Sequence, residues 1–400
     1  MSIRWRDAMD QALYGPGGFF VAGTGPADHF RTSVHASPAF ATALLRLLSQ
    51  VDTALGHPAR LSVVDVGAGR GELLLTLQRL VAADSAGVAV DVPSSVAVRP
   101  SLAERVRFTA VELAPRPEHL PEAIEWVSEI PAGITGLLIA TEWLDNIPLD
   151  VAVHTTDGWR YLLVDPGSGA ETVGELVSSA DLEWLTTWWP LPSDPPSPGT
   201  DSDPDPASTW TDATSGSEPG FRAARPAQGS SLTARSRPGC PDTPNGNARA
   251  EIGRSRDEAW AAAVQKIERG MAVAVDYGHL RESRPVDGTL TGYRGGRQVP
   301  PVPDGSSDVT AHVAMDSVAS AGADVALCAY SLVSQREALR AFGADGGRPP
   351  LSLAGTDPAG YVRALAAASA VAELTDPAGL GGHLWLRQPV GIGPAPGVAR

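Results

Sequence analysis

The chain has 400 residues, of which 46 are Asp or Glu and 31 are Lys or Arg, and its net charge is −15 at pH 7. This balance argues against nucleic acid as the main partner, because phosphate binding needs clustered Lys and Arg. Two cysteines, Cys240 and Cys328, cannot build a disulfide framework, and no Cys or His spacing is typical of a metal site.

Residues 1–60 are expected to be largely helical and to form a lid over a bound ligand. The first ten are mixed in charge and lack the apolar core of a signal peptide. No apolar run in the chain is long enough to span a bilayer. We therefore expect a cytoplasmic protein without membrane insertion.

A buried strand, a glycine-rich turn and a helix are predicted next. Residues 61–66 form a short β-branched run typical of a buried strand, and residues 73–80 are typical of a helix. Between them, glycines alternate at positions 67, 69 and 71. Glycine lets a backbone turn sharply and approach a ligand without side-chain clash, and a helix start offers unpaired N–H groups. The pattern predicts a nucleotide-type binding turn.

The glycine spacing distinguishes between ligands. A dinucleotide-binding turn has its third glycine five residues after the first, and Glu72 holds that position here. The observed pattern, D-x-G-x-G-x-G, is instead the first motif of class I methyltransferases, which bind S-adenosylmethionine (SAM). The expected SAM-binding residues of this turn are Asp65, Gly67, Gly69 and Gly71.

A second acid is expected beside the ribose of SAM, because a carboxylate can accept hydrogen bonds from both hydroxyls. Two residues are candidates. Glu112 ends an alternating strand over residues 107–113 and is preferred. The alternative, Asp91, follows a shorter apolar run that leads straight into Pro93.

Two further predicted strands end in acids. Residues 136–140 lead to Glu142 and Asp145, and residues 271–275 lead to Asp276. Ligands of open α/β sheets bind beyond the carboxyl ends of the strands, so these acids are expected to face the cofactor or its methyl acceptor. The alternative for the first group is a capping acid followed by a turn.

The predicted fold is α/β, a class I methyltransferase, Rossmann-like, doubly wound and mostly parallel sheet with helices on both faces. The SAM-binding core begins over residues 61–190 and resumes over 256–388, with a flexible tail over 389–400. Residues 191–255 are rich in Pro, Ser and Gly and are predicted to be a disordered insertion. An alanine-rich helix over 358–372 is expected to cover the sheet.

Several separated segments resemble the MidA-like class I methyltransferases, relatives of the mitochondrial complex I assembly methyltransferase. The matching segments follow the order of that family, and the ordered set is specific. They are residues 12–20, 30–40, 142–148 (E-W-L-D-N-I-P), 276–278, 288–293, 308–313 and 335–343. The resemblance covers most of residues 8–190 and 258–388.

The resemblance implies a SAM-dependent methyltransferase that acts on a protein arginine, with a respiratory complex I subunit as the expected partner. A guanidinium is fully protonated in water and must be oriented by carboxylates, a role we assign to Glu142 and Asp145. Thr32 and Ser33 are expected to close over the cofactor. The residues expected to line the substrate channel are Asp276, Tyr277, Asp308 and His312.

Other interpretations stay open at this level. Thr141 stands where that family usually has Asn, and Gly296 lies where it usually has His, so the acceptor is less defined than the cofactor. Asp308 is alternatively a helix cap, and His312 is alternatively a structural hydrogen-bonding residue. A small-molecule methyltransferase, a non-catalytic SAM-binding scaffold and an NAD(P)-dependent oxidoreductase are the alternative functions, and the glycine spacing counts against the last.

Overall fold

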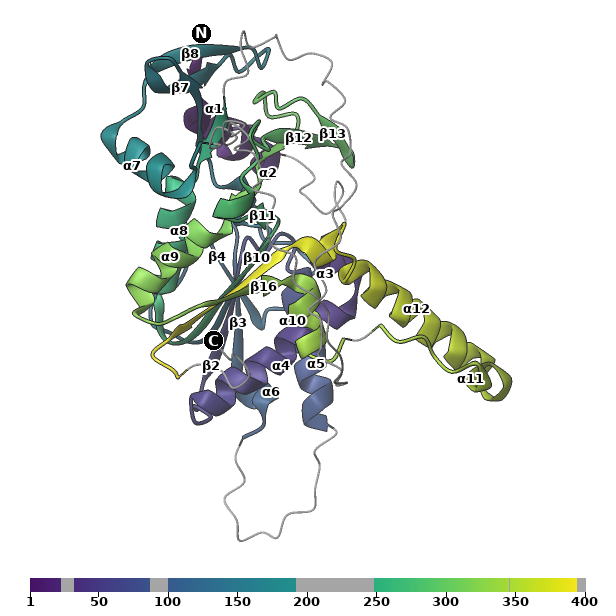
Figure 1. Ribbon diagram of the computed structural model, residues 1–400. Helices are drawn as coiled ribbons and strands as arrows, with labels where there is room; N and C mark the ends of the chain where they lie inside the picture. The colour runs from purple at the N-terminus through teal and green to yellow at the C-terminus, as the bar shows by residue number, and fades with distance from the viewer. Residues whose placement is uncertain (23–31, 87–99, 192–247, 345, 394–400) are drawn as a thin grey trace, which may run out of the picture. The chain divides into compact units, whose positions relative to one another are not determined.

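A seven-stranded mixed sheet lies at the centre of the computed structural model, which describes residues 1–22, 32–86, 100–191, 248–344 and 346–393 (Figure 1). Its strand order is β16-β17-β10-β5-β2-β3-β4. The strands are β2 (Leu61–Val66), β3 (Val106–Val111), β4 (Ile124–Val127), β5 (Ile134–Thr141), β10 (Ile267–Asp276), β16 (Ser331–Ser334) and β17 (Leu384–Val390). The first five of these pair in parallel, whereas β17 is antiparallel to both β10 and β16. The predicted α/β class is confirmed, and the sheet is mixed because β17 is antiparallel to its neighbours.

Alternating side chains of the central strands are buried on both faces of this sheet. Val63 and Leu137 belong to one apolar cluster, and Val64 and Leu138 belong to the other. Successive side chains of a strand point to opposite faces, so continuous β-branched runs suit strands that are covered on both sides. The three predicted strands are therefore observed. The strand predicted over 61–66 coincides with β2, and those predicted over 136–140 and 271–275 lie within the longer strands β5 and β10.

Helices cover both faces of the central sheet, as Figure 1 shows. On one face lie α4 (Pro38–Ala54), α5 (Glu72–Ala86) and α10 (Gln335–Ala341), and on the other α8 (Arg254–Gln265) and α9 (Met315–Ala326). Two short helices, α3 (Ser33–Ala36) and α6 (Leu102–Arg105), precede α4 and β3. No helix in the described part of the chain is long and apolar enough to cross a membrane.

An antiparallel sheet that was not predicted accompanies the central one. It contains β1 (Ile3–Arg4), β6 (Asp150–Thr155), β7 (Gly158–Val164), β8 (Glu171–Leu176) and β9 (Arg249–Ile252). Helix α1 (Trp5–Tyr14) buries Trp5 and Met9 against this sheet, next to α2 (Phe19–Ala22), and α7 (Ser179–Trp188) packs Trp184 against it. The described residues of the 1–60 segment are largely helical, and α1 packs on this second sheet whereas α4 packs on the central one.

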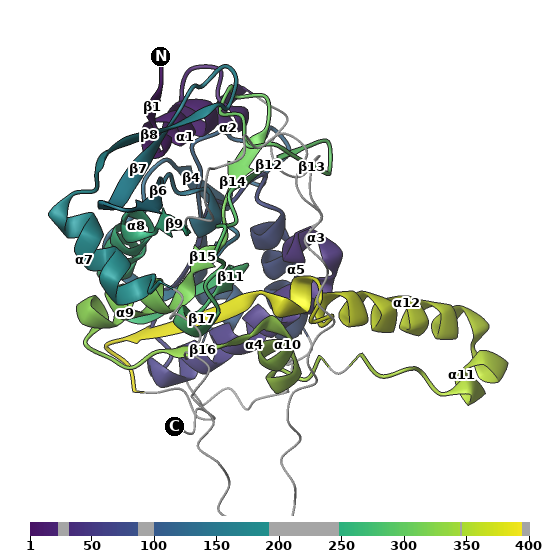
Figure 2. The same cartoon turned by 45° about the horizontal axis from the view of Figure 1, so that its top comes forward.

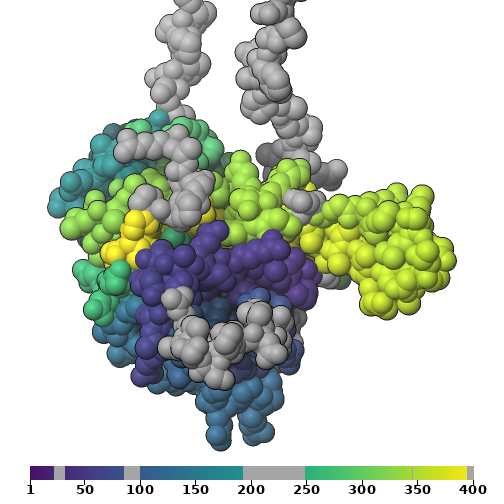
Figure 3. All heavy atoms as spheres, turned by 90° about the horizontal axis from the view of Figure 1, so that it is seen from below, coloured from purple at the N-terminus to yellow at the C-terminus, as the bar shows by residue number. Residues whose placement is uncertain are grey.

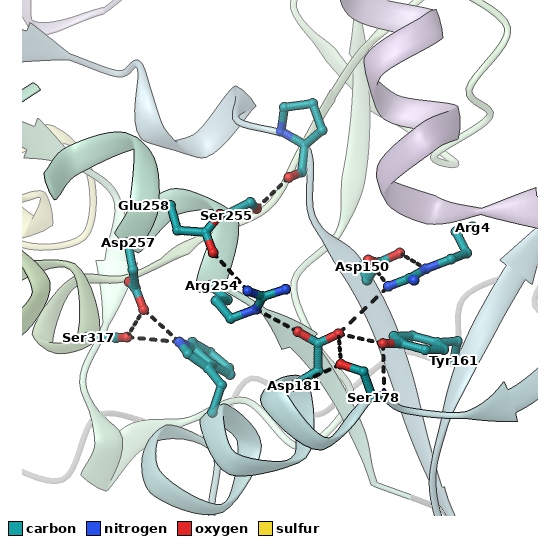
Figure 4. A network of polar contacts seen from close by, with 12 residues as sticks. Arg4, Asp150, Tyr161, Ser178, Asp181, Arg254, Ser255, Asp257, Glu258 and Ser317 are labelled. Carbon is teal, nitrogen blue, oxygen red and sulfur yellow. Dashed lines mark hydrogen bonds and ion pairs between the residues drawn. The ribbon is translucent and has the colours of Figure 1, made fainter. Parts of the chain in front are cut away.

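A polar network joins this second sheet to α7 and α8 (Figure 4). Asp181 of α7 accepts a hydrogen bond from Arg254 Nε of α8 at 2.9 Å, and its other oxygen lies 3.8 Å from Arg4 Nη2. Arg4 also donates to Asp150 and lies 3.8 Å above the centre of the Tyr161 ring. The network ties the first strand of the chain to elements more than 140 residues away.

Two smaller sheets, one of two strands and one of three, complete the described fold. Strands β11 (Gly278–His279) and β15 (Val313–Ala314) pair in parallel, and β12 (Thr291–Arg294) lies between β13 (Arg297–Val299) and β14 (Asp308–Thr310). Asp308 is therefore a strand residue, and its alternative interpretation as a helix cap is wrong, since α9 begins only at Met315.

The predicted insertion and tail are corrected at their ends. Residues 192–247, most of the predicted insertion, lie outside the described residues. Residues 249–252 form β9 and α8 begins at Arg254, because Ala250 and Ile252 are buried beside β6. The tail predicted from residue 389 starts within β17, and residues 394–400 lie outside the described residues.

The alanine-rich helix was expected to cover the sheet, but it does not. Helices α11 (Leu351–Thr356) and α12 (Pro358–Leu374) form a hairpin that projects from the rest of the fold (Figures 1, 2 and 3). We call residues 351–374 the arm. Leu374, at the base, is the one buried residue of α12, because the other apolar side chains extend beyond the body of the fold.

Two glycines allow the central parallel strands to approach closely. Gly136 of β5 and Gly270 of β10 face each other across the strand pair, and both have φ of +147°. A Cβ at Gly136 would lie 2.1 Å from the Ser62 carbonyl oxygen of β2, and one at Gly270 would lie 1.9 Å from the Gly136 oxygen. These contacts are too short for any side chain.

We expect Gly136→Ala to lower the free energy of unfolding by about 2–4 kcal/mol in urea denaturation, because the backbone of three strands must shift. Gly133→Ala is the matched control, since Gly133 has φ of +74° and nothing within 4 Å of its added Cβ. It should lose only the left-handed strain, about 1–2 kcal/mol. Equal losses in both variants would show that steric crowding at Gly136 is unimportant.

Candidate active site

A cavity of about 1290 Å³ opens at the carboxyl ends of β2, β3, β5 and β10. This is larger than most small-molecule pockets, which span about 300–1,000 Å³. Ten of the predicted site residues line it: Thr32, Asp65, Gly67, Gly69, Glu112, Glu142, Asp145, Tyr277, Asp308 and His312. Three others, Ser33, Gly71 and Asp276, lie behind this lining layer.

The glycine turn requires its glycines for different reasons. All three have left-handed backbones, with φ of +71° at Gly67, +58° at Gly69 and +80° at Gly71. A Cβ at Gly71 would lie 2.8 Å from Leu120 Cδ1, so this glycine serves packing. A Cβ at Gly69 would meet only Glu72 Oε2, at 3.9 Å, so Gly69 borders open space.

Glu112 follows β3 and fixes the turn. Its Oε2 accepts a hydrogen bond from the Gly69 N–H at 2.9 Å, and its Oε1 accepts from Leu113 and Ala114 at 2.8 and 3.1 Å. The carboxylate is thereby held at the cavity wall in one orientation. Asp91, the alternative ribose acid, lies outside the described residues.

Asp65 is the next-to-last residue of β2 and is only 3% exposed. Burial raises the pKa of its carboxyl to about 8, and the nearby carboxylates of Glu112 and Glu72 contribute to the shift. The group is therefore mostly protonated at pH 7 in this state. A cation placed beside it would favour the ionised form.

The start of α3 braces the opposite wall. Ser33 is fully buried, donates its N–H to Glu142 Oε1 at 3.2 Å, and donates its hydroxyl to Gln335 Oε1 at 3.1 Å. Thr32 lines the cavity and contacts His35 Nδ1 at 2.7 Å, and His35 Nε2 lies 3.5 Å from Glu72 Oε1. The sequence did not single out His35, whose pKa is raised because the hydrogen bond to Glu72 outweighs burial.

Glu142 lies directly after β5 in a strained conformation. Its φ is +49°, a left-handed value that costs energy for a residue with a side chain, and its N–H donates to the Val275 oxygen at 2.8 Å. Burial raises the pKa of its carboxyl to about 7, and the charge of Asp145 adds to the shift. The fold thus holds a carboxyl of near-neutral pKa at the cavity wall.

Asp145 is 3% exposed and has one oxygen without a partner. Tyr277 and Thr310 donate their hydroxyls to Oδ2, the latter at 2.8 Å, whereas buried Oδ1 accepts no hydrogen bond. Burial raises the pKa of this carboxyl, although both hydroxyls act to lower it. An unsatisfied buried carboxylate oxygen at a cavity wall is suited to a ligand donor.

Asp276 positions the chain behind the cavity. Its Oδ2 accepts from the N–H groups of Leu144 and Asp145 at 3.1 and 3.3 Å, and its Oδ1 accepts from Tyr277 N–H at 3.0 Å. Asp276 thus supports the turn that carries Asp145 and is not among the residues that line the cavity. Tyr277 itself lies at the cavity wall, with the His312 ring centre 5.1 Å from its own.

Arg256 joins two cavity-lining loops and was missed in the sequence. It is 1% exposed and donates to the oxygens of Ile147 at 3.2 Å, Ala311 at 3.0 Å and His312 at 2.9 Å, and also to that of Asp145. An inward-facing arginine at the start of a helix has no local sequence signal.

Two further polar features lie at the cavity wall. Asn146 Nδ2 donates to Asp308 Oδ1 at 2.7 Å, and Thr141 Oγ1 is buried without a hydrogen-bond partner. Within the residues that the structure describes, no group of three or more His, Cys, Asp or Glu side chains could hold a metal ion.

A family model described as putative S-adenosyl-L-methionine-dependent methyltransferase matches residues 43–331. No curated protein matches the chain. A structure from Burkholderia thailandensis, of a candidate methyl transferase bound to S-adenosyl-homocysteine, is similar with a TM-score of 0.65 and 21% identity. A native structure of an uncharacterised protein from the same organism gives 0.63 and 21%. Both matches cover 98% of this chain and 89% of the other, and they show the shared fold.

The free energy of unfolding should fall as pH rises from about 4.3 to 7, because Glu142 is protonated more readily in the folded chain than in the unfolded one. The stability that the raised pKa of Glu142 contributes is fully present below about pH 4.3 and is lost as the pH rises through about 7. Glu142→Gln cannot ionise, so between urea denaturation at pH 5 and pH 8 it should gain about 1–3 kcal/mol relative to the parent chain.

The control is Glu118→Gln, which changes an exposed glutamate of the same cavity. It should keep the pH dependence of the parent chain. If Glu142→Gln also keeps it, the carboxyl does not titrate near neutrality.

Proposed function

Because the chain belongs to this family of S-adenosyl-L-methionine-dependent methyltransferases, whose model spans more than half of its residues, we propose that it methylates an arginine side chain of a protein. Its cofactor is SAM. One observation carries the proposal: a single cavity joins the glycine turn and Glu112 to the carboxyl groups of Glu142 and Asp145.

The residues at the turn fit SAM, whose sulfonium and ammonium groups are cationic and whose ribose carries two hydroxyls. Gly69 borders open space where a side chain would intrude, and the acids Asp65, Glu72 and Glu112 line the same part of the cavity. We assign the ribose hydroxyls to Glu112 and the cationic groups to the other acids. The raised pKa of Asp65 supports this assignment, since a bound cation would restore its charge.

When bound, SAM supplies a methyl group that is already strongly electrophilic. The chain must therefore align a nucleophile and exclude water, which together contribute several kcal/mol in well-oriented reactions. Glu142 would hold the acceptor guanidinium and accept its proton at a carboxylate oxygen, since a base with a pKa near the working pH is most effective. Asp145 Oδ1 would accept a second N–H, while Tyr277 and Thr310 fix its other oxygen.

The charge of the cavity supports a cationic acceptor. Its acidic lining residues are Asp65, Glu72, Glu112, Glu118, Glu142, Asp145 and Asp308, and Arg70 is the one Lys or Arg among the described lining residues. A guanidinium keeps its charge at every physiological pH, so this acidic wall attracts it. A small guanidino compound would meet the same carboxylates, and the cavity volume admits either acceptor.

The resemblance to the MidA-like methyltransferases supports a protein acceptor, and with it a respiratory complex I subunit as the partner. The segments that carry the resemblance contribute cavity residues: Glu142 and Asp145 from residues 142–148, Tyr277 from residues 276–278 and His312 from residues 308–313. Thr141, which departs from the family pattern, also lines the cavity with an unpaired hydroxyl.

Calorimetric titration with SAM should give a dissociation constant in the micromolar range, and Glu112→Gln should weaken it at least about tenfold, because hydrogen bonds to a charged group contribute about 1.5–3 kcal/mol. Glu118→Gln is the matched control and should leave affinity within about twofold, since that side chain is exposed. NADH should give no heat. Binding of NADH instead of SAM by the folded protein would favour the oxidoreductase alternative.

Incubation with methyl-labelled SAM and a cell extract should place label in methylarginine after acid hydrolysis of the protein fraction. Glu142→Gln should lower this transfer at least about 100-fold while SAM affinity stays unchanged, because general acid–base groups contribute about 10²–10⁴-fold. Label found only in small molecules would favour the small-molecule alternative. SAM binding without any transfer would favour the scaffold alternative.

A further inference from the structure

Gln335, the first residue of α10, is fully buried and uses both ends of its side-chain amide in hydrogen bonds. Its Nε2 donates to the carbonyl oxygens of Leu374 at 3.2 Å and Leu380 at 2.9 Å. Its Oε1 accepts a hydrogen bond from the Ser33 hydroxyl at 3.1 Å. Because backbone carbonyl oxygens can only accept, they determine which end of the amide faces Ser33.

This contact fixes the orientation of Ser33, which is also fully buried. The Ser33 hydroxyl must donate to Gln335, since the amide oxygen has no proton to give. The backbone N–H of Ser33 faces Glu142 and donates to its Oε1 at 3.2 Å. Among the residues that the structure describes, this N–H is the one hydrogen-bond donor to the Glu142 carboxyl.

We propose that Gln335 is a positioning residue that acts through Ser33 to orient Glu142, and this role rests on the function proposed for Glu142 in methyl transfer. An amide suits the role, because it is a neutral side chain that accepts at one end and donates twice at the other. A buried amide whose partners are all in place also resists rotation, since turning it would leave several polar groups unpaired.

Gln335 also holds the cavity wall beside Glu142. Leu374 is the buried residue at the base of the arm, and Leu380 begins a short turn toward β17. The Gln335 backbone N–H donates to the oxygen of His383 at 2.7 Å, and His383 lines the cavity. One residue thus binds three carbonyl oxygens of the segment 374–383 and sets the position of the donor to Glu142.

The position of this donor affects the charge of Glu142. Burial raises the pKa of its carboxyl, whereas the Ser33 N–H acts to lower it, because a donor stabilises the ionised form. The other charged groups that interact with this carboxyl are those of His35, Asp145, Asp276 and Asp308. None of these four groups hydrogen-bonds to Gln335, so a change at Gln335 alters the Ser33 contact and leaves their charges in place.

The test is the pH at which the Glu142 carboxyl is half ionised, read by carbon-13 NMR of chains labelled at the glutamate carboxyl carbons. The Glu142 signal is the one that Glu142→Gln removes. Gln335→Met and Ser33→Ala should each move this midpoint to higher pH by about 0.5–1, because the donor to the ionised carboxyl is no longer held in place. The double variant should move it no further than Gln335→Met alone, since both changes act through one hydrogen bond.

Gln388→Met is the matched control. Gln388 is a fully buried glutamine of β17, and its Nε2 donates to the Cys328 oxygen at 3.1 Å. Like Gln335→Met, this change removes a buried hydrogen bond and should lower the midpoint of urea denaturation. It should leave the Glu142 midpoint where it is in the parent chain, because Gln388 has no hydrogen bond to Ser33 or Glu142. Circular dichroism checks the folding of every variant.

Two results would overturn the proposal. Unchanged Glu142 midpoints in Gln335→Met and Ser33→Ala would show that the donor does not depend on Gln335. An equal change in Gln388→Met would show general loosening of the fold. Should Gln335→Met fail to fold, Ser33→Ala decides, since it removes one hydroxyl and keeps the backbone N–H.

The NMR measurement does not depend on activity, so it separates this proposal from the proposed function. If the parent chain methylates protein, the pH at which kcat/KM is half-maximal should move in step with the NMR midpoint in both variants. If the parent chain transfers no methyl group while the midpoints still move, the proposed function is wrong and Gln335 still positions Glu142.

Discussion

The parallel pairing of β2, β5 and β10 is the constraint on which the site depends. Ser62 pairs with Gly136, and Gly136 pairs with Gly270, so the three strands run in register from this crowded contact near their starts to their carboxyl ends. Their carboxyl ends therefore come to one edge, which brings together Asp65, Glu142 and Asp276 from positions up to 211 residues apart. The cavity forms where the chain segments that follow β2, β5 and β10 leave the same edge of the sheet.

Crowding of acids at this edge gives the site its chemistry. Burial and mutual repulsion hold Asp65 and Glu142 at pKa values of about 8 and 7, so the unliganded protein keeps protons on groups that are normally ionised. A cation beside these carboxyls lowers the free-energy cost of ionising them, because it stabilises their charged forms. A cationic cofactor and a cationic acceptor each suit such a wall, and the family to which the chain belongs takes a cationic methyl donor.

Local signals made much of this site visible in the sequence. The strand over 61–66, the three glycines and the acid after the next strand are patterns of neighbouring residues, and the structure places them as expected around the cavity. Contacts between distant segments were not visible. Ser33 braces Glu142 from 109 residues away, and Arg256 reaches Asp145 across 111. The second sheet was missed for the same reason, because β1 pairs with β7 and β9 pairs with β6 over long separations.

The backbone contacts of Arg256 carry a mechanical consequence. One planar guanidinium group bonds the carbonyl oxygens of residues 145 and 147 in one loop and of residues 311 and 312 in the other. Neither loop can move outward alone without breaking several of these buried hydrogen bonds. Arg256 therefore holds the two loops together as one unit. Helix α3 and residues 377–383 also line the cavity, and α12 contacts both, so the base of the arm lies beside the cavity wall.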